Sequence, residues 1–149
     1  MNNQVSLNNK YLGNSKTFIV LEAGPTHQGL ISAKNLAKIA KECGADSIKF
    51  QMANIDRLMS DKSMNFEYKY LNFSKNGEEE FIKIEEPLYD ILKRRELTNE
   101  EWLELKYYCD EIDLHMFTTA CYKDEIDFAV DKLKIDSIKI ASSDIREEG

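Results

Sequence analysis

After a polar leader, the chain has the pattern of a strand, a helix and a second strand in direct succession, and this limits the possible folds more than any other feature. The apolar run at residues 17–24 predicts a strand covered on both faces. Apolar residues then recur at helical spacing over 33–43, with Ser32 as the expected N-cap and Gly44 as the expected left-handed residue after the last turn. A strand at 47–52 follows at once, so we expect parallel strands joined by a right-handed crossover.

One long interruption separates this unit from the rest of the pattern. Residues 53–97 are polar and contain several aromatic side chains, which predicts a long excursion with a short helix near 87–94. Thr98 and Glu101 then form a capping-box pattern that opens a helix ending near residue 111. The remaining elements are expected to be a strand, a helix and a strand at residues 114–120, 123–134 and 137–141.

The alternation of strands and helices predicts an α/β fold with a parallel sheet and helices outside it. Two architectures are open at this point: a small doubly wound sheet, or half of a (β/α)8 barrel. A complete barrel needs about 250 residues, whereas this chain has 149. Four strands without a closing helix favour the half-barrel.

The composition excludes several classes of partner. The net charge of -7 argues against nucleic acid or an anionic membrane surface. Cys43, Cys109 and Cys121 lack the spacing of metal ligands and are expected to be small buried thiols in a reducing compartment. The leader at residues 1–16 is polar rather than a signal peptide, and no run reaches the roughly 20 apolar residues of a membrane span. We therefore expect a cytoplasmic protein with no nucleic-acid or membrane partner.

A repeated tetrapeptide gives the first indication of a site. The sequence Asp-Ser-Ile-Lys occurs at 46–49 and again at 136–139, each time in a predicted strand. Side chains alternate along a strand, so Ile48 points to one face and Lys49 to the other, and Lys139 is placed in the same way. A lysine in an apolar strand is costly to bury without a partner. The two lysines therefore predict one anionic ligand shared between neighbouring strands, and ends that reach out to solvent are the alternative.

Other polar side chains follow the predicted strands at their carboxyl ends, where α/β folds bind their ligands. Lysines and hydroxyls donate hydrogen bonds to phosphate oxygens, and Glu22 adds a carboxylate for proton transfer or for a sugar hydroxyl. Structural roles are the alternatives: Glu22 as the partner of a lysine, His27 as a loop-stabilising side chain, and His115 at a strand start without a function. The candidates at these ends are Glu22, Thr26, His27, Gln28, Lys49, Gln51, Thr118, Thr119, Lys139, Ser142, Ser143 and Asp144.

Five segments resemble the sialic acid synthases, the family of N-acetylneuraminate synthase and its bacterial legionaminic and pseudaminic acid synthase relatives. The segments are FIVLEAGPTHQG, AKECGADSIKFQ, LTNEEWLELKYYCDE, MFTTACYKDEIDFA and IDSIKIASSD, in the order of the family between Thr17 and Asp144. The resemblance implies a TIM-type (β/α)8 barrel, of which residues 17–149 are the N-terminal part. The antifreeze-like C-terminal domain that commonly follows in the family has no match in these residues.

The resemblance also implies an activity. Members of the family condense phosphoenolpyruvate with an N-acylated amino sugar, such as N-acetylmannosamine or a diacetamido-trideoxy hexose, to give a nine-carbon 2-keto acid and phosphate. A divalent metal, manganese or magnesium, polarises the sugar aldehyde. The two histidines that bind it in the family lie past Gly149, so we expect no metal ligands here and no turnover by this chain alone. Small-molecule substrates and a homodimer are the expected partners.

The roles of site residues transfer by position within the matching segments. Glu22 matches the glutamate that contacts the sugar near the reacting carbon, so it is the expected catalytic residue. The positions that match the phosphoenolpyruvate-binding set are Lys49, Thr119, Lys139 and Ser142. Gln51 and Asp144 match polar positions that line the same cavity, and His27 matches the histidine of a loop Asn-His pair.

The sequence departs from the family at a few of these positions. Thr26 stands where asparagine is common, Ser143 stands where glycine is usual, and residues 118–121 are Thr-Thr-Ala-Cys where Ser-Thr-Pro-Phe is common. These changes, with the poor match of 53–97, bear on the identity of the sugar. Two rival functions stay open: another phosphoenolpyruvate-using enzyme, such as a 3-deoxy-sugar-acid synthase, and a diverged, non-catalytic binding or assembly module.

Overall fold

The computed structural model describes residues 6–7, 10–12 and 17–146. Most of the predicted leader at 1–16 therefore lies outside the described residues, apart from a short antiparallel pair of strands, β1 (Ser6–Leu7) and β2 (Lys10–Tyr11). The chain forms two compact units, one made of Met1–Ala53 with Arg95–Gly149 and the other of Asn54–Arg94.

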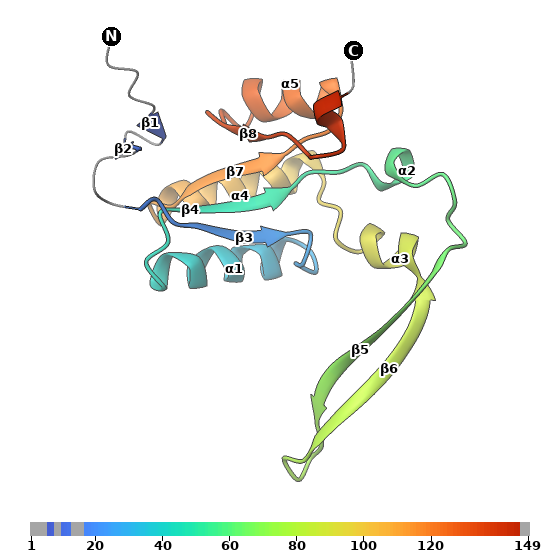
Figure 1. Ribbon diagram of the computed structural model, residues 1–149. Coiled ribbons are helices and arrows are strands. Elements are labelled where there is room, and N and C mark those ends of the chain that lie inside the picture. Colours follow the sequence, from blue (N-terminus) through green and yellow to red (C-terminus); the bar gives the residue numbers. More distant parts are fainter. Residues whose placement is uncertain (1–5, 8–9, 13–16, 147–149) are drawn as a thin grey trace. The chain divides into compact units, whose positions relative to one another are not determined.

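The first unit is built on a four-stranded parallel sheet (Figure 1). The strands are β3 (Val20–Gly24), β4 (Ser47–Gln51), β7 (His115–Thr119) and β8 (Ile138–Lys139). Their order in the sheet is β3-β4-β7-β8, which is also their order in the chain. A doubly wound sheet reverses direction at a switch point, whereas a barrel adds each strand beside the last. The strand order therefore favours the barrel over the doubly wound alternative.

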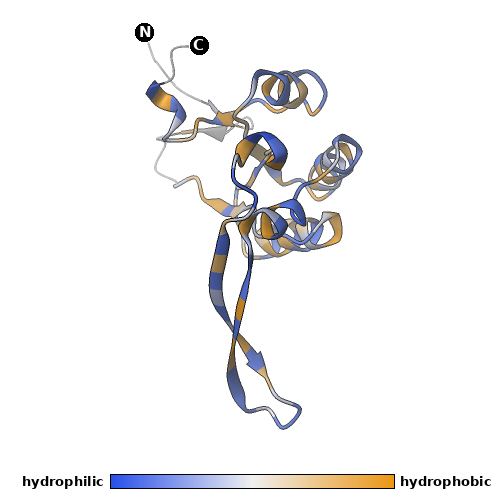
Figure 2. Ribbon diagram, turned by 90° about the vertical axis from the view of Figure 1, so that its right-hand side faces the viewer, coloured by the Kyte–Doolittle hydropathy of each residue, from blue (hydrophilic) through white to orange (hydrophobic). Residues whose placement is uncertain are grey.

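Helices cover one face of this sheet (Figure 2). They are α1 (Leu30–Glu42), α4 (Asn99–Glu111) and α5 (Lys123–Asp131). Their buried side chains, among them Ala37, Leu105 and Ala129, belong to a single apolar cluster with Ile48 and Phe50 of β4. Burying one apolar stripe from each helix against one sheet face is the main source of stability in such a layer. Lys49 and Gln51 alternate with Ile48 and Phe50 along β4, so they lie on the opposite face.

The helix α4 begins as the sequence predicts. The Thr98 hydroxyl accepts a hydrogen bond from the Glu101 amide at 3.2 Å, and the Glu101 carboxylate accepts one from the Thr98 amide at 2.8 Å. This reciprocal arrangement satisfies two amide groups that a helix N-terminus otherwise leaves without partners. The predicted capping box is confirmed, and the helix ends at Glu111 as expected.

Some expectations for the first unit are wrong. The helix α1 begins at Leu30 after Gly29, whose φ of 83° turns the chain into the helix, so Ser32 lies inside the first turn and is not the N-cap. Cys43 follows the last turn and is exposed, although Gly44 has the predicted left-handed conformation, with φ 80°. The strand β3 is shorter than predicted, and Val20 is partly exposed because β3 is an edge of this sheet in the part of the chain that the structure describes.

The last two elements are also shorter than predicted. The helix α5 ends at Asp131, and of its predicted inward positions Ile126 and Val130 are exposed while Ala129 is buried. The strand β8 contains only Ile138 and Lys139, and a short 3-10 turn at Asp144–Arg146 follows it. The predicted positions of both elements along the chain are nevertheless confirmed.

The second unit contains a long β-hairpin that the sequence reasoning did not predict. Its strands are β5 (Asn65–Phe73) and β6 (Glu79–Pro87), paired antiparallel over their full length. Both strands contain hydrophobic as well as hydrophilic residues (Figure 2). Two short helices flank the hairpin, α2 (Ile55–Leu58) and α3 (Leu88–Lys93), and α3 confirms the short helix expected near 87–94.

None of the helices in the described ranges combines the length and apolar character that a bilayer crossing requires.

Candidate functional site

The candidate site is centred on Lys49, on the sheet face opposite the helices. Its side chain is only 10% exposed, and its ammonium group lies 2.9 Å from the Glu22 carboxylate. It also donates to the Thr119 hydroxyl at 3.2 Å and to the Phe50 carbonyl at 3.4 Å. A lysine ammonium has three N–H donors, so these three oxygens satisfy all of them. Lys49 therefore ties β3, β4 and β7 together from one point.

The carboxylate that pairs with Lys49 is the accessible partner. The Glu22 side chain is 59% exposed, although Glu22 and Lys49 are directly opposite in the β3–β4 register. The register shifts between Glu22 and Gly24, which is the mark of a bulge, and such bulges often re-aim a side chain beside an active site. Gly24 has a φ of 52°, and a Cβ atom there would lie 3.2 Å from a Glu22 carboxylate oxygen. Gly24 thus gives the carboxylate room to fold back over the strand end.

The second lysine lies on the same sheet face, two strands further along, on β8. Lys139 pairs in register with Thr119 of β7, and Thr119 pairs with Gln51 of β4. Lys139 is therefore level with Gln51, two residues nearer the carboxyl end than Lys49, with β7 between the two lysines. Lys139 is exposed, whereas Thr119 is buried. The carboxyl end of this face thus presents two cationic groups of unequal burial.

The chain after β8 returns to the end of β7. Asp144 accepts a hydrogen bond from the Ser143 hydroxyl at 2.7 Å, while Ser142 is exposed. The pKa of the Cys121 thiol is raised, chiefly by burial and then by the charges of Asp144 and Glu125, while Lys139 acts in the opposite direction. Sequence reasoning missed Cys121 as a neighbour of Asp144 and Lys139. The only signal for it in the sequence is its position directly after the third predicted strand.

The structure does not bring His27 to the face that carries Lys49. His27 is completely buried, and its ring packs edge-on against Phe50 with the ring centroids 5.9 Å apart. Phe50 belongs to the cluster under the helices, so His27 lies on the helix side of the sheet. Burial lowers the pKa of His27, with a further contribution from the Arg95 charge. The predicted contact of His27 with substrate remains a prediction.

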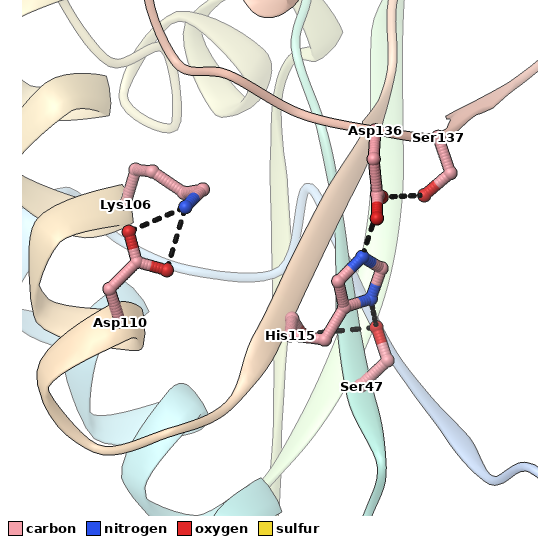
Figure 3. A network of polar contacts seen from close by, with 6 residues as sticks. All are labelled: Ser47, Lys106, Asp110, His115, Asp136 and Ser137. Carbon is pink, nitrogen blue, oxygen red and sulfur yellow. Dashed lines mark hydrogen bonds and ion pairs between the residues drawn. The ribbon is translucent and has the colours of Figure 1, made fainter. Parts of the chain in front are cut away.

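A second polar network occupies the amino ends of the same strands (Figure 3). The Ser47 hydroxyl lies 2.8 Å from His115 Nδ1, and His115 Nε2 lies 2.8 Å from the Asp136 carboxylate. The residue types match a hydrolytic triad, but Ser47 is completely buried and cannot meet a substrate. Barrel enzymes place their sites at the opposite, carboxyl ends of the strands. His115 is at the strand start, as predicted, and the network is best understood as a clasp between β4, β7 and the segment before β8.

Metal binding has no support from the side chains of this site. Among the described residues, no group of three or more His, Cys, Asp or Glu side chains is arranged to hold a metal ion. A divalent metal stays a prediction, and the roles proposed for Glu22 and Lys49 do not depend on one.

The comparisons with known proteins agree on one family. Residues 36–148 match the NeuB family. The chain is 33% identical to the N,N'-diacetyllegionaminic acid synthase of Legionella pneumophila, over 89% of this chain and 35% of that protein. It is 32% identical to the human N-acetylneuraminate-9-phosphate synthase, over 89% of this chain and 34% of that protein. The chain thus spans about a third of the length of the curated relatives it matches.

A solved structure supports the fold. The N-acetylneuraminic acid synthetase of Leptospira borgpetersenii aligns with a TM-score of 0.71 and 24% identity, over 95% of this chain and 42% of the other. The α/β fold of the TIM-barrel type, with four parallel strands in this chain, is confirmed. Since the family match covers most of its residues, the chain belongs to the NeuB family of sialic acid synthases and their relatives.

Proposed function

We propose that this chain carries the phosphoenolpyruvate-binding part of a sialic-acid-type synthase. The reaction joins carbon 3 of phosphoenolpyruvate to the aldehyde carbon of an N-acylated amino sugar. Water adds at carbon 2, and phosphate leaves by cleavage of the C–O bond, which gives a nine-carbon 2-keto acid. The observation that carries the proposal is the nearly buried Lys49 ammonium, held between Glu22 and Thr119 at the carboxyl end of the sheet.

The arrangement at Lys49 suggests how an anion enters. All three ammonium donors already have oxygen partners, and one of these partners is itself an anion. A phosphate or carboxylate that bound Lys49 beside Glu22 would meet the repulsion of a like charge. The exposed Glu22 carboxylate is the partner free to move, because the Thr119 hydroxyl and the Phe50 carbonyl are fixed in the sheet. Anion binding and release of Glu22 are therefore one event in this proposal.

The other candidates have supporting roles. Lys139, Ser142 and Thr119 add donors for the phosphate and carboxylate oxygens, since hydrogen bonds with a charged partner are the stronger kind. Gln51 and Asp144 line the same end of the sheet. Glu22, once it leaves Lys49, is the proposed contact to the sugar near the reacting carbon. The proposed substrates are the small molecules of a cytoplasmic pathway, and the proposed assembly is a homodimer.

The test is calorimetric titration of phosphoenolpyruvate into the 149-residue chain and its variants. Lys49→Ala is expected to weaken binding at least tenfold, and the matched control Lys38→Ala, on the exposed surface of α1, is expected to bind like the wild type. Equal affinity of Lys49→Ala and wild type for phosphoenolpyruvate contradicts the proposal. Circular dichroism of both variants verifies that each is folded.

The identity of the sugar is a separate question. The two relatives are named for different products, an N,N'-diacetyllegionaminic acid and an N-acetylneuraminate 9-phosphate. A panel of N-acetylmannosamine, its 6-phosphate and a diacetamido-trideoxy hexose, assayed with manganese in a full-length synthase that carries this segment, separates these candidates. We propose that the 149-residue chain alone gives no product in this assay, because its site lacks a set of metal ligands in the described residues. Robust product formation contradicts that part of the proposal.

A further inference from the structure

His27 is the most unusual side chain of the first unit. It is completely buried, and neither of its ring nitrogens makes a hydrogen bond with any described residue. A buried polar group without a partner is costly, and a charged one is far more so. The charged groups that act on it are Arg95, just before α4, and Glu101 in the first turn of α4. The packing from β4 comes from Phe50, which does not titrate.

A short series of contacts leads from this ring to the candidate site. The His27 ring packs on Phe50, and Phe50 is the register partner of Gly24 at the bulged end of β3. Gly24 in turn borders the Glu22 carboxylate, which is paired with Lys49. His27 also follows directly after the turn in which the Thr26 hydroxyl and amide both donate to the Ala23 carbonyl. The imidazole therefore packs against the register partner of Gly24, at the bulge between Glu22 and Gly24 in β3.

We propose that His27 is a positioning residue, whose neutral ring holds the bulged end of β3 so that Glu22 faces Lys49. Protonation of the ring at acidic pH then drives it out of the core and releases the turn at 24–29 together with the Glu22 carboxylate. The proposal concerns conformation only, and it holds or fails independently of the proposed function.

The pH range follows from the direction of the shift. Burial lowers the pKa of His27 below its ordinary value of 6.5. In the unfolded chain the ring titrates near 6.5, so below that pH the unfolded state binds a proton that the folded state lacks. The stability is therefore complete above pH 6.5 and falls as the pH drops from 6.5 toward the folded pKa. One proton is involved, so the released population rises by at most about tenfold per pH unit.

The experiment is an NMR titration of the 149-residue chain between pH 8 and pH 4.5. The chain has two histidines, so a His115→Gln variant assigns both imidazole signals. The expected result is a His27 midpoint below 6.5, with the amide signals of Glu22, Gly24 and Lys49 following the same midpoint. A His27 midpoint at or above 6.5, or amides that do not move with it, overturns the proposal.

A variant provides an independent arm. His27→Phe keeps an aromatic ring on Phe50 and removes the titration, so the coupled amide changes below pH 6.5 are expected to disappear. His115→Gln, which alters only the amino-end network, is expected to keep them. If His27→Phe shows the same acid transition as the wild type, the proposal is wrong. If His27→Phe does not fold, the wild-type titration decides alone.

Discussion

The two ends of the same sheet carry similar polar networks, each with a buried basic side chain paired to an exposed carboxylate, but only the carboxyl end is proposed to bind a ligand. At the carboxyl end, Lys49 is 10% exposed and its acid partner Glu22 is 59% exposed; at the amino end, His115 is 8% exposed and its acid partner Asp136 is 53% exposed. A buried lysine ammonium is costly without an anion or acceptor oxygens beside it, and both ring nitrogens of His115 already have side-chain partners in Ser47 and Asp136. In the proposed function an anionic ligand replaces the exposed carboxylate of the first pair, whereas no ligand is proposed for the second.

The repeated tetrapeptide explains why both networks occur together. In the first copy Ser47 belongs to the amino-end clasp and Lys49 to the candidate site, and in the second copy Asp136 and Lys139 divide in the same way. Each copy spans one strand, so it places one polar residue at either end of the sheet. The repeat therefore reflects the networks at both ends of the sheet, and not only the candidate site.

The largest expected effect separates the two ends by ligand binding. Lys49→Met removes the ammonium but keeps the apolar stem, and we expect about a 100-fold loss of phosphoenolpyruvate affinity, equal to roughly 2.7 kcal/mol. Stability in urea is expected to change by less than about 1 kcal/mol, because replacing a buried charge with an apolar group is often neutral. Lys139→Met, on the same face but exposed, serves as the control with a smaller loss of affinity. If Lys49→Met binds phosphoenolpyruvate as tightly as the wild type, ligand binding does not distinguish the carboxyl end from the amino end.

The reverse pattern is expected at the amino end. His115→Ala breaks the contacts with Ser47 and Asp136 and leaves a void between β4 and β7, which we expect to cost about 2 kcal/mol of unfolding free energy. Phosphoenolpyruvate affinity of the folded chain is expected to stay within about twofold of wild type, a difference of roughly 0.4 kcal/mol. Urea unfolding and calorimetry measure the two quantities. A large loss of affinity with unchanged stability would show that the clasp belongs to the binding site.

A smaller effect tests the exchange of partners at Lys49. Glu22→Gln keeps a hydrogen-bond acceptor for the ammonium but removes the competing charge, so phosphoenolpyruvate affinity is expected to rise about fivefold, or roughly 1 kcal/mol. Competition titrations with inorganic phosphate measure the same change with a simpler anion. Weaker binding by Glu22→Gln, in a chain that is folded, indicates that Glu22 is not displaced by the ligand.

The smallest effect concerns the hollow of about 160 Å³ beside the clasp, which is lined by Lys106, His115 and Lys134 among others. Lys134 follows α5 with a φ of 55°, a left-handed conformation that glycine adopts without strain. Lys134→Gly is expected to raise the unfolding free energy by about 0.5 kcal/mol and to leave ligand affinity unchanged. A loss of phosphoenolpyruvate binding in this variant would assign the hollow a role in binding.

The sequence predicts the parts of the fold that depend on local pattern. The helical spacing of apolar residues and the capping box at Thr98 place α1 and α4, and alternation places Ile48 and Lys49 on opposite faces. The hairpin was missed although its signals are present, since Phe66, Tyr68 and Tyr70 alternate with polar residues and Asn76-Gly77 is a common turn pair. Because the segment is polar overall, this alternating pattern was not recognised, although a count of alternate positions would have found it.

Two features of the site depend on information that no local pattern contains. The network of Ser47 with His115 depends on the register between two strands that lie far apart in the sequence. The burial of His27 depends on the bulge between Glu22 and Gly24, which sets the direction in which the next turn leaves the sheet. Sequence reasoning placed His27 at the correct end of the sheet, but it had no means of assigning the side.

The central claim is that phosphoenolpyruvate binds the buried Lys49 by taking the place of Glu22. A crystal structure of this chain with phosphoenolpyruvate tests it most directly. The account predicts a phosphate or carboxylate oxygen about 3 Å from the Lys49 ammonium, with the Glu22 carboxylate turned away from it. A bound phosphoenolpyruvate elsewhere on the chain, with the 2.9 Å pair of Glu22 and Lys49 intact, would contradict the account.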